Sequence, residues 1–182
     1  MNERYGFNDK PTLIDNNKFD NLDDDFNYNK PEEMKKGQYA KVYRGWDKKE
    51  YYDNYINAES KDFKYGEGGT VDGVGTYATD NRWSAMEYSE NDGLFMEIAI
   101  PSDAKFISIE DLNELHYGIY NKYNENRKMY EKKYGTKVTD ILDTMNQNVS
   151  TTAVLNGYDI IYDNKYRNWV ILNRKILKIK KK

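Results

Sequence analysis

Two stretches of the sequence carry residue types that suit the binding of an anionic ligand. In VYRGW, Arg44 shares one face of a predicted strand with Ala40 and Val42. A partly inward-facing arginine needs an anionic partner, which makes Arg44 a candidate binding residue. The second stretch is GVGTYATDNRWSAMEYS, residues 73–89, where a glycine-spaced turn leads to Tyr77 among threonines and then to small and aromatic residues at helical spacing. This pattern predicts a strand, a turn and a short helix.

The elements that must position these residues follow from apolar periodicity. The run GLFMEIAIP predicts a strand that Pro101 ends, and YDIIY, WVILN and ILKI predict three short strands near the C-terminus. The charged segment 110–134 predicts a helix on the surface, and apolar residues from Val138 onward predict an amphipathic helix that stops before Gly157. This order of elements indicates a mixed α+β fold.

Composition predicts one folded domain, with an arm before it. Residues 1–36 are rich in Asp and Asn without a regular period, so we expect an arm with at most one short helix, and a domain over residues 37–182. The chain has 182 residues, no cysteine and one histidine, which argues against disulfides and against a zinc site. It has neither a signal pattern nor an apolar run of about 20 residues, so we expect a soluble, cytoplasmic protein without a membrane partner.

Charge is uneven along the chain, although the net charge is only −3. The C-terminal RKILKIKKK is strongly basic. A solvated tail after the last strand is the interpretation that we favour, and contact between this tail and nucleic acid is the alternative.

Taken in order, four stretches resemble the ADP-ribosyltransferase superfamily: VYRGW, GVGTYATDNRWSAMEYS, FMEIAIPSDAKFI and GYDIIYDNKYRNWVILNRKILKI. The resemblance covers most of residues 42–179 and leaves out the arm and the helical excursion at about 110–135. It implies a split mixed β-sheet core with peripheral helices. It further implies that NAD is the substrate and that ADP-ribose passes to a macromolecular acceptor, most simply a protein. Such glycosyltransferases include toxins and phage effectors that act in a host cytoplasm.

The resemblance also implies roles for five residues. Arg44 would hold a phosphate or ribose hydroxyl of the dinucleotide, and Gly45 would let the cofactor approach the backbone. Tyr77 would stack on the nicotinamide ring. Thr76 and Thr79 would order the strand or bind a ribose hydroxyl.

At one position the sequence departs from the family, which places a catalytic acid before the last motif. In this sequence that position is Asn168, whose side chain can accept a hydrogen bond but carries no charge. Asp163, in the preceding loop, is the first candidate for a replacement acid, with Glu67 and Glu87 as alternatives and a shifted alignment as another. A missing unit charge about 4 Å from the reacting centre costs roughly 4 kcal/mol at an effective dielectric near 20, or about a thousandfold in rate.

Three classes of function therefore stay open. The first is NAD-dependent mono-ADP-ribosyl transfer. The second is a catalytically inactive binding module or inhibitor of the same fold, which Asn168 favours. The third is another NAD-consuming reaction, such as NAD hydrolysis or 2′-phosphate transfer on RNA. A triad built on the lone His116 is disfavoured, because that histidine is expected on the surface of the charged segment.

Overall fold

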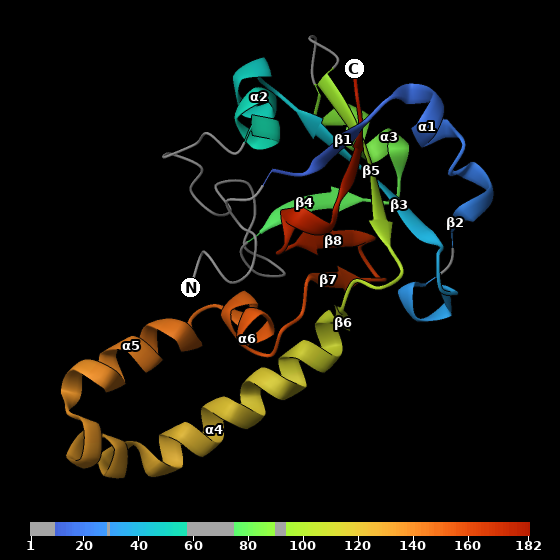
Figure 1. Cartoon of the computed structure of the whole chain (residues 1–182). Coiled ribbons are helices and arrows are strands. Elements are labelled where there is room, and N and C mark those ends of the chain that lie inside the picture. Colours follow the sequence, from blue (N-terminus) through green and yellow to red (C-terminus); the bar gives the residue numbers. More distant parts are fainter. Residues whose placement is uncertain (1–9, 29, 58–74, 90–93) are drawn as a thin grey trace.

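One strongly twisted mixed sheet forms the body of the protein (Figure 1). A computed structural model describes residues 10–28, 30–57, 75–89 and 94–182. The sheet has nine strands, in the order β1-β9-β5-β3-β4-β8-β7-β6, with β2 pairing beside β3. Along the chain the strands are β1 (Thr12–Ile14), β2 (Phe26–Asn27), β3 (Tyr39–Trp46), β4 (Thr76–Thr79), β5 (Leu94–Pro101), β6 (Phe106–Ser108), β7 (Ile160–Asp163), β8 (Asn168–Ile171) and β9 (Lys178–Lys180). The expected α+β class is confirmed.

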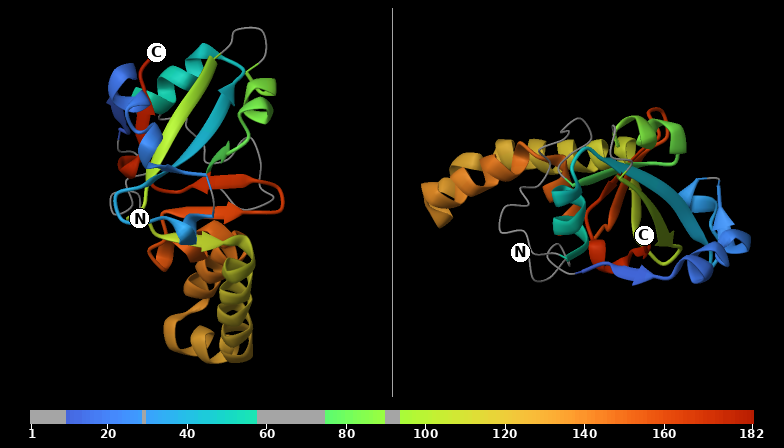
Figure 2. Two further views of the ribbon diagram at one scale, coloured as in Figure 1. Left: turned by 90° about the vertical axis from the view of Figure 1, so that its right-hand side faces the viewer. Right: turned by 90° about the horizontal axis from the view of Figure 1, so that it is seen from above.

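The sheet divides into two halves between β3 and β4. These strands pair only at Tyr43 and Thr79, whereas β3 pairs with β5 along its whole length. Figure 2 shows the consequence, because the half that contains β3 and β5 crosses the half that contains β7 and β8 at a steep angle. The inner faces of both halves turn toward each other and share the largest core cluster, which includes Val42, Ile98 and Trp169.

Helices cover the outer faces and the open end of this bent sheet. The α-helices are α1 (Asn16–Asp20), α2 (Lys49–Asn57), α3 (Arg82–Glu87), α4 (Ile109–Tyr134), α5 (Thr136–Asn146) and α6 (Val149–Leu155), and the short 3-10 helices are η2 (Asp23–Asp25), η3 (Pro31–Glu33) and η5 (Arg174–Ile176). Helix α2 packs Tyr52 and Tyr55 into the inner core. On the outer face of β4, β8 and β7, the start of α4 and helix α6 bury a second core that includes Leu112 and Val154.

The N-terminal segment joins the sheet, in contrast to the arm expected over residues 1–36. Strand β1 pairs in parallel with β9, and β2 pairs in parallel with β3. Phe19 is fully buried, and together with Phe26 it covers the outer face of the β3–β5 half beside Ala99. Isolated aromatic side chains in a polar segment provide this cover, so no periodic pattern predicts it. Within the described residues, β1 and β2 of this segment belong to the same sheet as the strands that follow residue 36.

Helices α4 and α5 form a hairpin that projects from the body (Figure 1). The helix expected at 110–134 is confirmed as α4, which begins where the Ser108 hydroxyl accepts a hydrogen bond from the Asp111 backbone N–H at 3.0 Å. It ends at Gly135, whose φ of 84° lies in the region that favours glycine. The single helix expected from Val138 is instead divided into α5 and α6, because Asn148 caps a new helix through the Ser150 backbone N–H at 2.9 Å.

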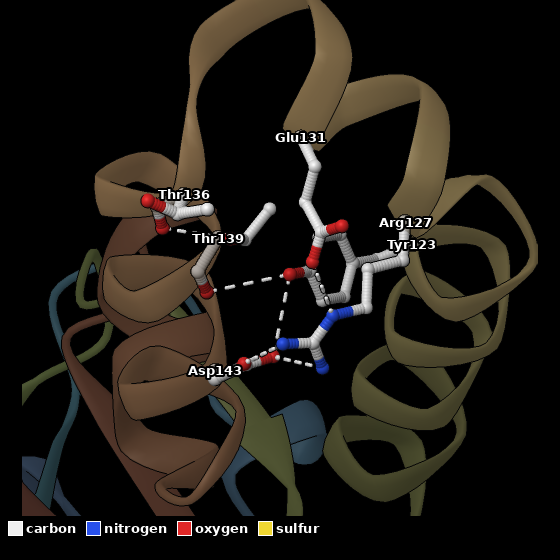
Figure 3. A network of polar contacts seen from close by, with 6 residues as sticks. All are labelled: Tyr123, Arg127, Glu131, Thr136, Thr139 and Asp143. Atoms are coloured by element: carbon white, nitrogen blue, oxygen red, sulfur yellow. Dashed lines mark hydrogen bonds and ion pairs between the residues drawn. The ribbon is translucent and has the colours of Figure 1, made fainter.

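A polar network ties the two helices of this hairpin together (Figure 3). Arg127 donates two hydrogen bonds to the Asp143 carboxylate, at 2.7 and 3.3 Å, and one to Glu131 at 3.1 Å. The Tyr123 hydroxyl lies 3.3 Å from the Thr139 carbonyl oxygen and 3.3 Å from an Asp143 carboxylate oxygen. These contacts hold the hairpin together where it leaves the apolar core.

His116 is buried, so its expected surface position is wrong. Its Nδ1 lies 2.7 Å from the Thr152 hydroxyl of α6, and its Nε2 lies 3.2 Å from the Asn146 carbonyl oxygen. The imidazole therefore joins α4 to the helices that follow it. This structural role leaves no part for His116 in a catalytic triad.

A membrane-spanning helix is not found among the described residues, because no helix there combines sufficient length with an apolar sequence.

Candidate ligand-binding site

The three motifs that carry the resemblance meet on neighbouring strands. Arg44 lies on β3, Tyr77 on β4 and Asn168 on β8, and these strands are consecutive in the sheet. A row of paired residues crosses all three strands where the halves divide, since Tyr43 is opposite Thr79 and Thr79 is opposite Asn168. Residues far apart in the sequence thus lie on neighbouring strands where the two halves of the sheet divide.

Strand alternation nevertheless places these side chains on two faces. Arg44 shares the inner face with Val42 and Trp46, whereas Tyr77 packs against the outer core beneath α4 and α6. Asn168 alternates with the inner residue Trp169 and lies on the same face as Tyr77. The Tyr77 ring therefore does not lie opposite Arg44. Only the Tyr77 carbonyl oxygen meets the guanidinium, as the acceptor of a hydrogen bond from Arg44 Nη1.

Arg44 is a partly buried cation without a carboxylate partner among the described residues. Its guanidinium carbon lies 4.2 Å from the centroid of the Trp46 ring. Arg44 Nε and the Trp46 indole N–H are both buried, and neither has a hydrogen-bond partner within the described ranges. Burial lowers the pKa of Arg44, and Tyr55 and Asp47 oppose that shift. A desolvated guanidinium beside an unpaired donor is an arrangement that an anionic or acceptor-rich ligand would complete.

A second arginine, which the sequence analysis did not identify, lies close by and is buried. Arg174 in η5 donates to the Tyr55 carbonyl oxygen at 3.3 Å, and its guanidinium carbon lies 5.1 Å from the centroid of the Tyr55 ring. The Tyr55 ring is in turn 5.2 Å from the Trp46 ring. Burial raises the pKa of Tyr55, while the Thr76 hydroxyl and the guanidiniums of Arg174 and Arg44 act against that rise. The inner face therefore holds two guanidiniums around one phenol.

The two threonines have different surroundings. Thr76 is buried on the inner face, next to Tyr55. Thr79 accepts a hydrogen bond from the Asn81 backbone N–H at 3.1 Å, and the Asn81 side chain then caps α3 through the Trp83 backbone N–H at 3.1 Å. Thr79 thus shapes the turn into α3, whereas Thr76 belongs to the polar group around Arg44.

Gly45 makes room for a helix. A Cβ atom at this position would lie 2.0 Å from the Ala85 carbonyl oxygen and 2.7 Å from the Ser89 backbone nitrogen. The backbone at the end of α3 therefore occupies the space that the resemblance assigns to the cofactor.

We expect Gly45→Ala to lower the free energy of unfolding by about 3 kcal/mol, because the added methyl group overlaps backbone atoms that cannot rotate away. Urea unfolding followed by tryptophan fluorescence measures this change. Gly118→Ala is the matched control, since a Cβ there meets nothing within 4 Å and a helical alanine stabilises by roughly 0.5–1 kcal/mol. Equal stabilities for the two variants would contradict the close packing of α3 on β3.

The three candidate acids have different surroundings. Asp163 is buried, and one carboxylate oxygen accepts hydrogen bonds from the backbone N–H groups of Lys165 at 2.7 Å and Tyr166 at 3.1 Å. It therefore holds the β7–β8 turn and is not free to swing toward a ligand. Glu87 is exposed at the end of α3. Glu67 lies outside the described residues.

One carboxylate near Asn168 was not anticipated. Asp80 follows Thr79, the residue opposite Asn168, and its carboxylate lies 2.5 Å from Arg167 Nε. Arg167 has a φ of 58°, an uncommon backbone conformation for a residue with a side chain. This ion pair ties the β7–β8 turn to the start of α3. No local pattern indicates the pair, because its partners are 87 residues apart.

Searches against known proteins add no family. No family model matches the chain, no curated protein matches it, and no solved structure matches it. Within the described ranges, the acidic and histidine side chains form no group of three that could hold a metal ion.

Proposed function

We propose that this chain is an NAD-dependent ADP-ribosyltransferase that modifies a macromolecular acceptor. The observation that carries the proposal is Arg44, a desolvated guanidinium without a carboxylate partner in the described part of the chain. The position of Arg44 supports it, because β3 lies in the sheet beside β4 and β8, the strands of Tyr77 and Asn168.

The residues around Arg44 fit an acceptor-rich ligand such as a dinucleotide. Arg44 Nε and the Trp46 indole N–H supply two buried donors that phosphate or ribose oxygens could occupy. Arg174 adds positive charge on the same inner face, beside Tyr55. In the reaction, the bond between nicotinamide and ribose breaks, nicotinamide leaves, and a nucleophile of the acceptor bonds to the same ribose carbon.

The fit is incomplete where charge should stabilise the ribose cation. Asn168 is neutral, and Asp163 is committed to its turn. These two observations favour a second candidate function, a catalytically inactive binding module of the same type that acts on a partner protein. The transferase requires NAD at Arg44 and turnover, whereas the binding module requires no turnover.

Binding and turnover measured on the same protein separate these functions. We expect NAD to bind in titration calorimetry, and labelled NAD to release nicotinamide and to label an acceptor in a cell extract. Binding without nicotinamide release would support the binding module. Absence of NAD binding would contradict the transferase.

A further inference from the structure

The tip of the projecting hairpin carries a local excess of positive charge. Residues 127–137 include one arginine, four lysines and one glutamate, a net charge of +4 in a chain of net charge −3. The remainder of the chain therefore carries −7. The four lysines, all exposed, are Lys128, Lys132, Lys133 and Lys137.

The hairpin network leaves these lysines unneutralised. Glu131, the carboxylate within the tip, and Asp143 of the facing helix are both bound to Arg127 (Figure 3). None of the four lysines forms an ion pair with another described residue. Arg127 therefore uses the nearby acids to hold the helices together, and the outer lysines keep their full charge.

Three lysines near the C-terminus, in contrast, have side-chain partners. Lys180 lies 2.7 Å from Asp20, Lys181 lies 2.7 Å from Asp15, and Lys178 contacts the Tyr39 hydroxyl. Two lysines of the basic C-terminus, where the sequence suggested a contact with nucleic acid, thus pair with acids of the N-terminal segment. The four lysines of the hairpin tip have no such pairs among the described residues, and α4 is about 39 Å long, so its tip lies far from the sheet.

Exposed aromatic surface accompanies this charge. Tyr134 is 51% exposed, and its ring stacks on that of Tyr130 with 6.1 Å between the ring centroids. Lys133 Nζ lies 5.0 Å from the centroid of the Tyr134 ring. Lysines beside exposed tyrosine rings suit a polymer that offers both phosphates and bases, because bases stack on such rings while phosphates pair with the ammonium groups.

We infer that the hairpin tip, defined as Lys128, Lys132, Lys133, Tyr134 and Lys137, binds the phosphate backbone of nucleic acid. The surface is remote from Arg44, and the inference does not depend on NAD chemistry. Binding is electrostatic and independent of sequence, so salt weakens it steeply. Such a tip would keep the sheet and its ligand site close to a nucleic acid.

The test is fluorescence anisotropy of the full chain with a labelled DNA duplex of about 20 base pairs and with the corresponding single strand, each between about 50 and 200 mM salt. With four phosphate contacts on the duplex, the logarithm of the affinity should fall against that of the salt concentration with a slope of about −3.6. Replacing the four lysines by glutamine should weaken binding at low salt by at least about tenfold and reduce the slope toward zero. Tyr134→Ala should weaken binding to the single strand more than to the duplex.

The matched control replaces Lys10, Lys30, Lys35 and Lys36 by glutamine, four exposed lysines of the body that change the net charge equally. We expect this control to retain the affinity and slope of the native chain. Equal losses in both quadruple variants would contradict a local binding surface. Binding of vesicles with anionic lipids, together with no binding of either DNA, would overturn the inference in favour of a membrane contact.

Discussion

Asn168→Glu is expected to raise the rate of nicotinamide release from NAD by about a thousandfold. Asn168 begins β8 in the row of residues that crosses to β3 beside Arg44. Its side chain lies on the outer face with Tyr77, so this effect requires the ribose to reach that face at the division between β3 and β4 while Arg44 holds another part of the dinucleotide on the inner face. One unit charge about 4 Å from the ribose cation is then worth roughly 4 kcal/mol at an effective dielectric near 20. Single-turnover release of labelled nicotinamide measures the effect.

The control for this substitution is Asn164→Glu. Asn164 is exposed in the β7–β8 turn, so the same charge is added a few residues from the strand. We expect no change in turnover for this variant. If Asn168→Glu leaves NAD binding intact and turnover unchanged, the reacting ribose does not lie at the start of β8, and the binding module becomes the better proposal.

Arg44→Met is expected to abolish tight NAD binding without destabilising the fold. Removing a charge-assisted contact that a buried guanidinium makes with a ligand costs about 2–4 kcal/mol, or roughly 30- to 1000-fold in affinity. In the free protein, however, Arg44 is desolvated without a carboxylate partner among the described residues, so a methionine of similar length should keep or increase the free energy of unfolding. Calorimetry with NAD and urea unfolding measure the two quantities separately.

A residue that only held the sheet together would behave in the opposite way. If Arg44→Met lowered stability and left NAD affinity unchanged, Arg44 would be structural, and the hydrogen bond to the Tyr77 carbonyl oxygen would be its purpose. Arg82→Met provides the control, because Arg82 is an exposed arginine of α3 that stacks on Phe95. It should leave both NAD affinity and stability close to those of the native chain.

The two arginines of the inner face illustrate how stability and binding compete in this protein. Arg174 satisfies part of its donor set on the Tyr55 carbonyl oxygen and stacks on the Tyr55 ring. Arg44 has one backbone acceptor, while its Nε and the neighbouring Trp46 indole have none within the described ranges. Unsatisfied buried donors cost free energy in the unliganded protein, and a ligand that accepts from them recovers it. This contrast is why we place the site at Arg44.

Local patterns in the sequence were sufficient for several of the regular elements. Alternation along residues 39–46 and 94–101 predicted β3 and β5, and it placed Arg44 on the inner face with Val42. Helical composition predicted α4, and the short apolar runs predicted the strands near the C-terminus. These features depend on neighbours a few residues apart, which a single sequence displays directly.

The tertiary structure alone decided how polar side chains are used. The sharp division between β3 and β4 and the strand alternation put the Tyr77 ring on the face opposite Arg44, which no motif could indicate. His116 became buried through Thr152, and Lys180 found Asp20 at a separation of 160 residues along the chain. Each outcome depends on which distant segments pack together. The free energy of a buried or paired polar group is set by those partners, and local periodicity carries no information about them.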